Sequence, residues 1–288
     1  MSVARSHSRA CSVFAASSGR RVLIGNNEDA SPTAAEMNAQ LTFRMATAGA
    51  TFGKLFFHMP EVMNDFPQGG MNTAGLFIDA LTTPPPTGPV QYPDGTEEYP
   101  GGTAALLHTI FDRCAHVDEA LAMLTRFTLP EVDRAQLFVA DRTGAAAVLG
   151  VDHDNRIAVT RKTGPFLLAT NFSLADPRRG NYPEPRYALG SQYWQEHPRV
   201  TVRNALTLLA ALHLEADPVT IYSNIYDLRR REMYLYYFHN YADVVKIHLP
   251  SELAIRGSRT VPVRSLFPVE PFAVSYTMRI HGARRQSE

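Results

Sequence analysis

The sequence has little cysteine and no long apolar run. Its 288 residues include two cysteines, Cys11 and Cys114, which are too few for a disulfide framework. We therefore expect a reducing, cytoplasmic location. No stretch reaches the ~18 consecutive apolar residues that a membrane-spanning helix needs. The first ten residues also lack the apolar segment of a secretory signal. These absences argue against the disulfide-rich secreted and membrane-spanning classes.

Neither sign of charge is in excess, because 28 Lys and Arg residues balance 28 Asp and Glu residues. Without a basic excess we expect neither nucleic acid nor a membrane as a partner. The chain also lacks the GxxxxGK[ST], GxGxxG, GxSxG and HExxH motifs. Its ten histidines are scattered without zinc-ligand spacing. We therefore expect no cofactor and no metal.

What the sequence does have is ordinary globular composition, with 45% hydrophobic and 19% charged residues. Period-two and helical spacings alternate in blocks along the chain. They predict strands at residues 12–16, 21–25, 41–43, 55–58, 75–81, 135–141, 145–151, 156–161, 166–170, 220–226, 232–238 and 244–249, and helices at residues 103–114, 117–126, 186–196 and 201–212. Strands, two helices, strands, two helices and strands predict an α+β fold whose mainly antiparallel sheets lie between helices.

Cys11 stands at the start of the first predicted strand, and Asp29 follows the strand that pairs with it. Because a hairpin folds back on itself, Asp29 and Asn26 can return to the level of Cys11. If Cys11 became the N-terminus, its α-amine, with an ordinary pKa of about 7.7–8.0, could take the thiol proton. Asp29 would then hold the amine, and no histidine would be needed.

Five motifs occur in order along the chain. They are Cys11-Ser12-Val13-Phe14, Gly25-Asn26-Asn27-Glu28-Asp29, the segment GGMNTAGL at residues 69–76, Thr170-Asn171-Phe172 and Pro185-Arg186-Tyr187. Together they resemble the choloylglycine hydrolase and penicillin acyltransferase-type cysteine hydrolases, the linear-amide group of the N-terminal-nucleophile superfamily. The resemblance covers residues 11–249. It implies a four-layer αββα sandwich and a small-molecule substrate, a linear acyl amide.

The resemblance also implies that the nucleophile is exposed by autoproteolysis or by an aminopeptidase. We therefore expect residues 1–10 to be a leader that is removed, residues 11–257 to form a single domain, and residues 258–288 to be a poorly packed C-terminal tail. The resemblance further implies that homo-oligomers occur.

Site residues follow from the resemblance position by position. Cys11 matches the nucleophile, Asp29 the carboxylate that orients the amine, and Asn171 the asparagine that donates to the oxyanion. Arg186 matches an arginine that lies near the nucleophile and the carboxylate. Bile-salt members of the family usually carry arginine at the place of Asn26 and often asparagine at the place of Thr82. Thr82 is therefore a candidate oxyanion donor through its backbone N–H, and a bile-salt substrate is not expected.

Three functions remain open at this stage. The chain is a hydrolase, an acyltransferase that passes the acyl group to an amine, or a catalytically silent binding protein that keeps residues 1–10. The apolar segments Met59–Phe66 and Gly70–Leu81 are expected to flank a pocket beside Cys11, which favours apolar acyl groups. Cys114, on an apolar helical face, is expected to be an inert buried residue.

Overall fold

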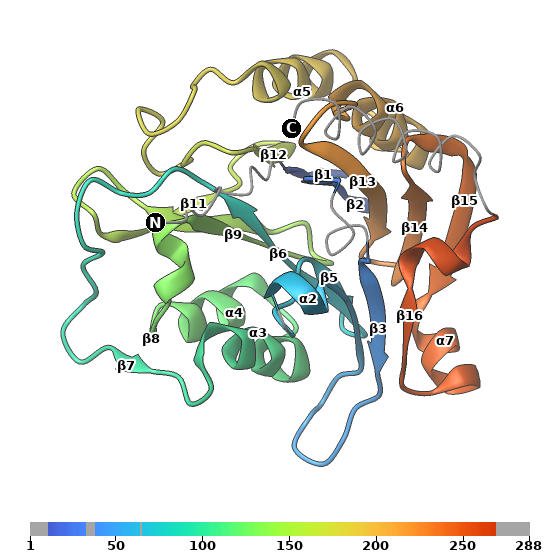
Figure 1. Cartoon of the computed structure of the whole chain (residues 1–288), viewed down its shortest axis with the longest axis horizontal. Helices are drawn as coiled ribbons and strands as arrows, with labels where there is room; N and C mark the ends of the chain where they lie inside the picture. Colours follow the sequence, from blue (N-terminus) through green and yellow to red (C-terminus); the bar gives the residue numbers. More distant parts are fainter. Residues whose placement is uncertain (1–10, 33–37, 64, 269–288) are drawn as a thin grey trace, which may run out of the picture.

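The computed structural model describes residues 11–32, 38–63 and 65–268, so the expected leader, residues 1–10, lies outside the described part of the chain. Figure 1 shows four layers from top to bottom: a helix pair, two sheets, and a second helix pair. This is the αββα sandwich that the family resemblance implies. Within each of the two large sheets, all neighbouring strands pair in the antiparallel direction.

The first sheet has six strands and begins at Cys11. In spatial order they are β12 (Phe166–Ala169), β1 (Ser12–Ser18), β2 (Arg21–Ala30), β13 (Val219–Asp227), β14 (Glu232–Tyr237) and β15 (Asn240–His248). Pairing of Ser18 with Arg21 leaves a two-residue turn between β1 and β2. Gly19 occupies this turn with φ +57°, a conformation that glycine adopts without strain.

The second sheet has eight strands, assembled mainly from the middle of the chain. Their spatial order is β11 (Ile157–Arg161), β10 (Ala146–Val151), β9 (Ala135–Asp141), β6 (Leu76–Thr82), β5 (Gly70–Asn72), β4 (Lys54–His58), β3 (Gln40–Arg44) and β16 (Arg259–Pro262). Two-residue strands β7 (Glu97–Glu98) and β8 (Phe127–Thr128) pair separately.

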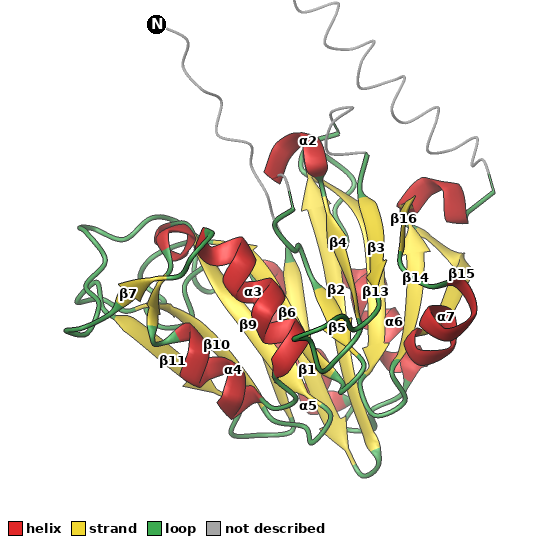
Figure 2. Ribbon diagram, turned by 90° about the horizontal axis from the view of Figure 1, so that it is seen from below, coloured by secondary structure: helices red, strands yellow, loops and turns green. Residues whose placement is uncertain are grey.

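In the described part of the chain, helices cover the outer faces of both sheets (Figures 1 and 2). Helices α3 (Gly102–Arg113) and α4 (Val117–Leu124) pack on the eight-stranded sheet. Helices α5 (Pro185–Glu196) and α6 (Val202–Leu212) pack on the six-stranded sheet. In α4 the buried residues Val117, Ala120, Leu121 and Leu124 follow the helical period.

Three apolar cores result from this layering. One lies between the sheets, and one lies between each sheet and its helices. A strand therefore buries both faces: Val13 and Ala15 of β1 face the other sheet, whereas Phe14 and Ala16 face the helices. We call the side chains between the two sheets the inter-sheet layer.

The C-terminal part differs from the prediction. Residues 258–268 are not a poorly packed tail, because β16 pairs with β3 and Val263 in the 3₁₀ turn η2 (Val263–Leu266) is buried. Helix α7 (Leu249–Arg256), which the sequence did not predict, connects β15 to β16. The boundary expected at residue 258 is therefore too early, and residues 269–288 lie outside the described part.

The Pro-rich loop between β6 and α3 borders a hollow on the surface. Its residues Pro85, Pro86 and Pro89 line a surface hollow of about 460 Å³ together with Thr128 and Pro130, the latter in η1 (Pro130–Asp133). The short helix α2 (Pro60–Met63) lies beyond β4. Within the described residues, no helix combines the length and apolarity needed to cross a bilayer.

Candidate active site

Cys11 lies immediately before β1, with its side chain in the inter-sheet layer and 3% of its surface exposed. Burial raises the pKa of its thiol well above the ordinary value, and the charges of Glu28 and Asp29 raise it further. A hydrogen bond from the backbone of Asp29 acts in the opposite direction. While Cys11 is still linked to Ala10, the thiol is therefore protonated at neutral pH.

Asp29, near the end of β2, is fully buried and has two polar partners. Thr220 Oγ1 donates to its Oδ1 at 2.5 Å, and Arg186 Nη1 donates to its Oδ2 at 3.1 Å. Burial raises the pKa of Asp29, whereas the Thr220 hydrogen bond and the Arg186 charge lower it. A buried pair of this kind costs about 3–5 kcal/mol to break by removing one partner, so the geometry of Asp29 is firmly held.

Arg186, in the first turn of α5, links most of the candidate residues. Its Nη2 donates to Asn171 Oδ1 at 2.9 Å, and its Nε donates to Glu184 Oε1 at 2.7 Å. Its Nη1, bound to Asp29, also lies 3.5 Å from the carbonyl oxygen of Cys11. The planar guanidinium therefore fixes the main chain of Cys11, the Asp29 carboxylate and the Asn171 amide relative to one another.

Asn171 connects the two sheets at this point. Its Nδ2 donates to the carbonyl oxygen of Thr82, at the end of β6, at 2.9 Å. The N–H of the next residue, Thr83, bonds to Arg134 beyond β9. Because main-chain groups alternate sides along a strand, the N–H of Thr82 points to the same side as its carbonyl, away from β9. Asn171 and the Thr82 N–H are thus directed to the same side of β6.

The sixth predicted residue, Asn26, lies outside this network. It is on β2, opposite Asn224 of β13, and its side chain shares the inter-sheet layer with Cys11. Sequence reasoning missed Glu184 and Thr220, which hold Arg186 and Asp29. Thr220 has no local signal, because Asp29 lies 191 positions away along the chain. Glu184 does have one, because it precedes Pro185 at the N-terminus of α5, where its side chain caps the helix two positions from Arg186.

Comparison with solved structures finds the same arrangement of helices and sheets in two variants of the conjugated bile acid hydrolase from Clostridium perfringens. The TM-scores are 0.64 and 0.63, at 14% and 13% identity, over 88% and 87% of this chain and 97% and 96% of those chains. The chain has the conjugated bile acid hydrolase fold. A penicillin V acylase from Agrobacterium tumefaciens matches at 13% identity, with a TM-score of 0.49, over 79% of this chain and 82% of that chain.

No family model and no curated protein sequence matches the chain. The resemblance predicted from five short motifs is therefore confirmed through the bile acid hydrolase fold, which this chain keeps at low sequence identity. Low identity also means that the residues around Cys11 must be interpreted from their own contacts.

The two apolar segments that were expected to flank Cys11, residues 59–66 and 70–81, divide their side chains between two layers. Met71 and Phe77 do face the inter-sheet layer. Leu76, Ile78 and Phe66 instead face α3 and α4, because successive side chains of a strand point to opposite faces. The predicted segments therefore contribute only some of their apolar side chains to the layer beside Cys11, and Asp79, two residues after Phe77 on β6, lies on the same face of the strand.

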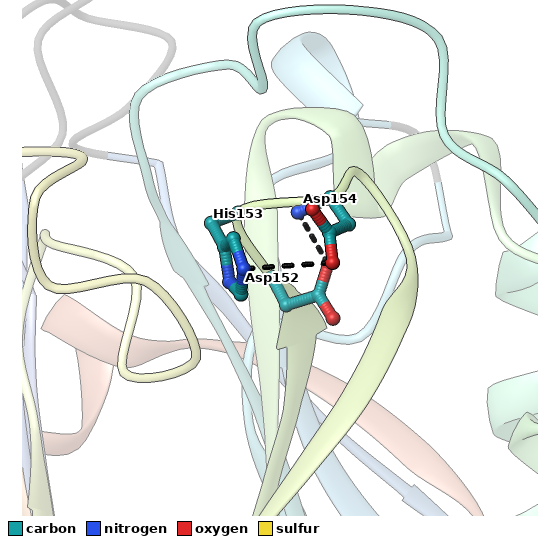
Figure 3. A group of neighbouring side chains, drawn as sticks. All are labelled: Asp152, His153 and Asp154. Atoms are coloured by element: carbon teal, nitrogen blue, oxygen red, sulfur yellow. Dashed lines mark hydrogen bonds and ion pairs between the residues drawn. The ribbon is translucent and has the colours of Figure 1, made fainter.

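Asp152, His153 and Asp154, between β10 and β11, present possible metal ligands within 4.8 Å of one another (Figure 3). Asp152 Oδ1, however, already accepts the backbone N–H groups of Asp154 and Arg156, each at 2.9 Å. These hydrogen bonds lower the pKa of Asp152 and define a turn. Because His153 and Asp154 are exposed, we assign no metal site to this group.

The reactivity of the two cysteines provides a first prediction. We expect iodoacetamide to modify Cys11 slowly at neutral pH in the chain that keeps residues 1–10, and faster as pH rises through its raised pKa. Removing the leader should accelerate modification at pH 7 at least about tenfold, because the new α-amine can accept the thiol proton. Peptide mapping by mass spectrometry measures both rates.

Cys114 is the internal control for this labelling. Its thiol lies 3.6 Å from the sulfur of Met123, and burial raises its pKa to about 11. Its rate should not depend on the leader. Equal acceleration of both cysteines would indicate general loosening of the fold rather than activation of Cys11.

Proposed function

We propose that the chain is a hydrolase of linear acyl amides in which Cys11, after loss of residues 1–10, is the N-terminal nucleophile. The observation that carries this proposal is the continuous network from Asp29 through Arg186 to Asn171 and the Thr82 carbonyl. Arg186 also reaches the main chain of Cys11. Four of the predicted residues, Asp29, Arg186, Asn171 and Thr82, are thus joined in one network that reaches the main chain of the proposed nucleophile.

Because the pKa of the Cys11 thiol is raised, the thiol needs a nearby base to lose its proton at neutral pH. No histidine takes part in the described contacts of Cys11, Asp29, Arg186 or Asn171. The α-amine of a newly exposed Cys11 supplies that base with an ordinary pKa of about 7.7–8.0. An amide nitrogen is not basic, so the bond between Ala10 and Cys11 must be cut first. Asp29, held by Thr220 and Arg186, would orient the resulting amine.

The reaction then has two halves. The Cys11 thiolate attacks the substrate carbonyl, the leaving amine takes a proton, and an acyl-enzyme thioester forms. Water attacks the thioester, which releases the acid and regenerates the thiol. Asn171 Nδ2 has a second hydrogen besides the one donated to Thr82, and it is available for the oxyanion together with the Thr82 N–H.

The test is the intact mass of the purified protein together with its amidase activity. We expect active protein to lack residues 1–10 and to begin at Cys11. A variant that starts at Cys11 through an engineered protease site should show the same activity. Activity from a chain that still begins at Met1 or Ser2 would contradict the free-amine mechanism. Adding an amine acceptor to the same assay separates hydrolysis from acyl transfer by the products formed.

A further inference from the structure

Beside Cys11 the inter-sheet layer changes from apolar to polar along three strands. On β2, Ile24 and Ala30 face this layer, and the positions of the same face between them are Asn26 and Glu28. The register of β1 and β2 ends with Ser12 opposite Asn27, so Glu28 lies beside Cys11. The charge of Glu28 accordingly acts on the Cys11 thiol.

The neighbouring strand β13 continues the polar surface. Asn224 lies opposite Asn26, and Tyr222 lies opposite Glu28. Tyr222 stacks on Phe57 of the other sheet with ring centroids 4.5 Å apart, and Tyr226 contacts Phe77. Both tyrosines therefore stand between the sheets, with their rings packed against apolar partners.

Several of these buried polar groups have no hydrogen-bond partner among the described residues. The amide groups of Asn26 and Asn224 and the hydroxyls of Tyr222 and Tyr226 are all unbonded, although these residues are at most 1% exposed. Buried polar groups in folded proteins are nearly always hydrogen-bonded, so a group of four such side chains on adjacent strands requires an explanation. A ligand that supplies the missing partners provides one.

Asp79 of β6 brings a second carboxylate to this surface from the opposite sheet. The Ala80 N–H donates to its Oδ1 at 2.7 Å, whereas its buried Oδ2 has no hydrogen-bond partner in the part of the chain that the structure describes. Gly69, at φ +115°, leaves room for the carboxyl, because a side chain there would stand 3.2 Å from it. No described basic side chain forms an ion pair with Asp79. Burial raises the pKa of its carboxyl well above the ordinary value, and the charge of Glu28 raises it further. The surface beside Cys11 is thus acidic.

We propose that this surface binds a cationic group, an ammonium, carried by the acyl amide that Cys11 attacks. The six side chains that receive it are Asn26, Glu28, Asp79, Tyr222, Asn224 and Tyr226. An ammonium has three donors and one positive charge, which match the carboxylate, amide and phenol oxygens converging from both sheets. The inference rests on the proposed hydrolase function and specifies its substrate class.

The test is a matched panel of N-acyl anilides offered to the processed protein. The acyl chains have one length and end in ammonium, hydroxyl, methyl or carboxylate, and a second series carries the same groups on the amine part. In one of the two series, we expect kcat/KM for the ammonium substrate to exceed that of the methyl substrate at least about tenfold. A higher rate for the methyl or carboxylate substrate in both series overturns the proposal.

Two isosteric variants test whether the two carboxyl groups cause the preference for ammonium substrates. Asp79→Asn and Glu28→Gln should each lower the ammonium-to-methyl ratio about tenfold, mainly through KM. The control Asp118→Asn, at an exposed helical position paired with Arg161, should keep the wild-type ratio. Unchanged ratios in both variants would contradict the assignment. If one variant does not fold, the wild-type panel and the other variant still decide.

The outcomes separate this inference from the function on which it rests. If hydroxyl substrates equal ammonium substrates, the surface binds a neutral polar group and the cationic assignment is wrong while hydrolysis stands. If the processed protein cleaves no member of either series, and mass spectrometry detects no acyl-enzyme at Cys11, the proposed hydrolase function itself is wrong, and the inference about its substrate is wrong with it.

Discussion

Replacing Cys11 with alanine should leave a folded protein whose amide hydrolysis is indistinguishable from background. Loss of a covalent nucleophile removes the acyl-enzyme route entirely, and in other enzymes such a change costs on the order of 10⁶ in kcat. The fold should tolerate it, because Cys11 lies at the start of β1 and its sulfur is small. Far-UV circular dichroism and thermal unfolding check the fold, and progress curves with an N-acyl anilide check the rate.

Two companion variants make this result specific. Cys114→Ala removes the other buried thiol, which lies between α3 and α4, and should retain activity. Cys11→Ser keeps a hydroxyl nucleophile, and its intact mass reports whether residues 1–10 are removed without the thiol. Turnover by Cys11→Ala above the uncatalysed rate would exclude nucleophilic catalysis by this residue and, with it, the proposed mechanism.

The sheets and outer helices follow from patterns visible in the sequence. A strand covered on both faces appears as an unbroken apolar run, as in Val13 to Ala16, and the turn glycine at Gly19 marks the hairpin. The outer helices have the opposite signature, one apolar stripe per helix, and α4 is the clearest example. These signals are local, so they can be recognised without knowing the rest of the fold.

The C-terminal elements could not be predicted in the same way. Helix α7 has proline at its second position and buries only Leu249 and Leu253. Strand β16 is an edge strand that follows a glycine at φ +63° and exposes part of every residue. These two elements are stabilised by packing against distant parts of the chain, β16 on β3 and α7 beside β15. Such contacts leave no periodic pattern in the local sequence.

The residues of the candidate site also differ in how well the local sequence predicts them. Cys11, Asp29, Asn171 and Arg186 were found because each belongs to a motif that resembles a known family. The partners that hold them, Glu184 and Thr220, were not. The polar surface could have been found by continuing the alternation of β2, because Asn26 and Glu28 occupy positions of its inward face between apolar residues.

Asn171→Ala should lower kcat by about 10²–10³ with little change in KM. Asn171 Nδ2 is directed toward the end of β6, where the oxyanion of the tetrahedral intermediate would meet the Thr82 N–H. A donor that acts on charge developing in the transition state contributes about 2.7–4 kcal/mol to its stabilisation and little to substrate binding. Steady-state kinetics with a saturating N-acyl anilide measure the two parameters separately.

Asn171 also accepts from Arg186, so the alanine variant alone does not isolate the donor. Asn171→Asp keeps an acceptor oxygen for Arg186 Nη2 and removes both N–H hydrogens. Its kcat should fall at least as far as that of Asn171→Ala, since the carboxylate would also repel the oxyanion. If Asn171→Asp instead retained wild-type kcat while only the alanine variant lost it, the side chain would act by anchoring Arg186 and thereby Asp29, and the oxyanion would depend on main-chain donors.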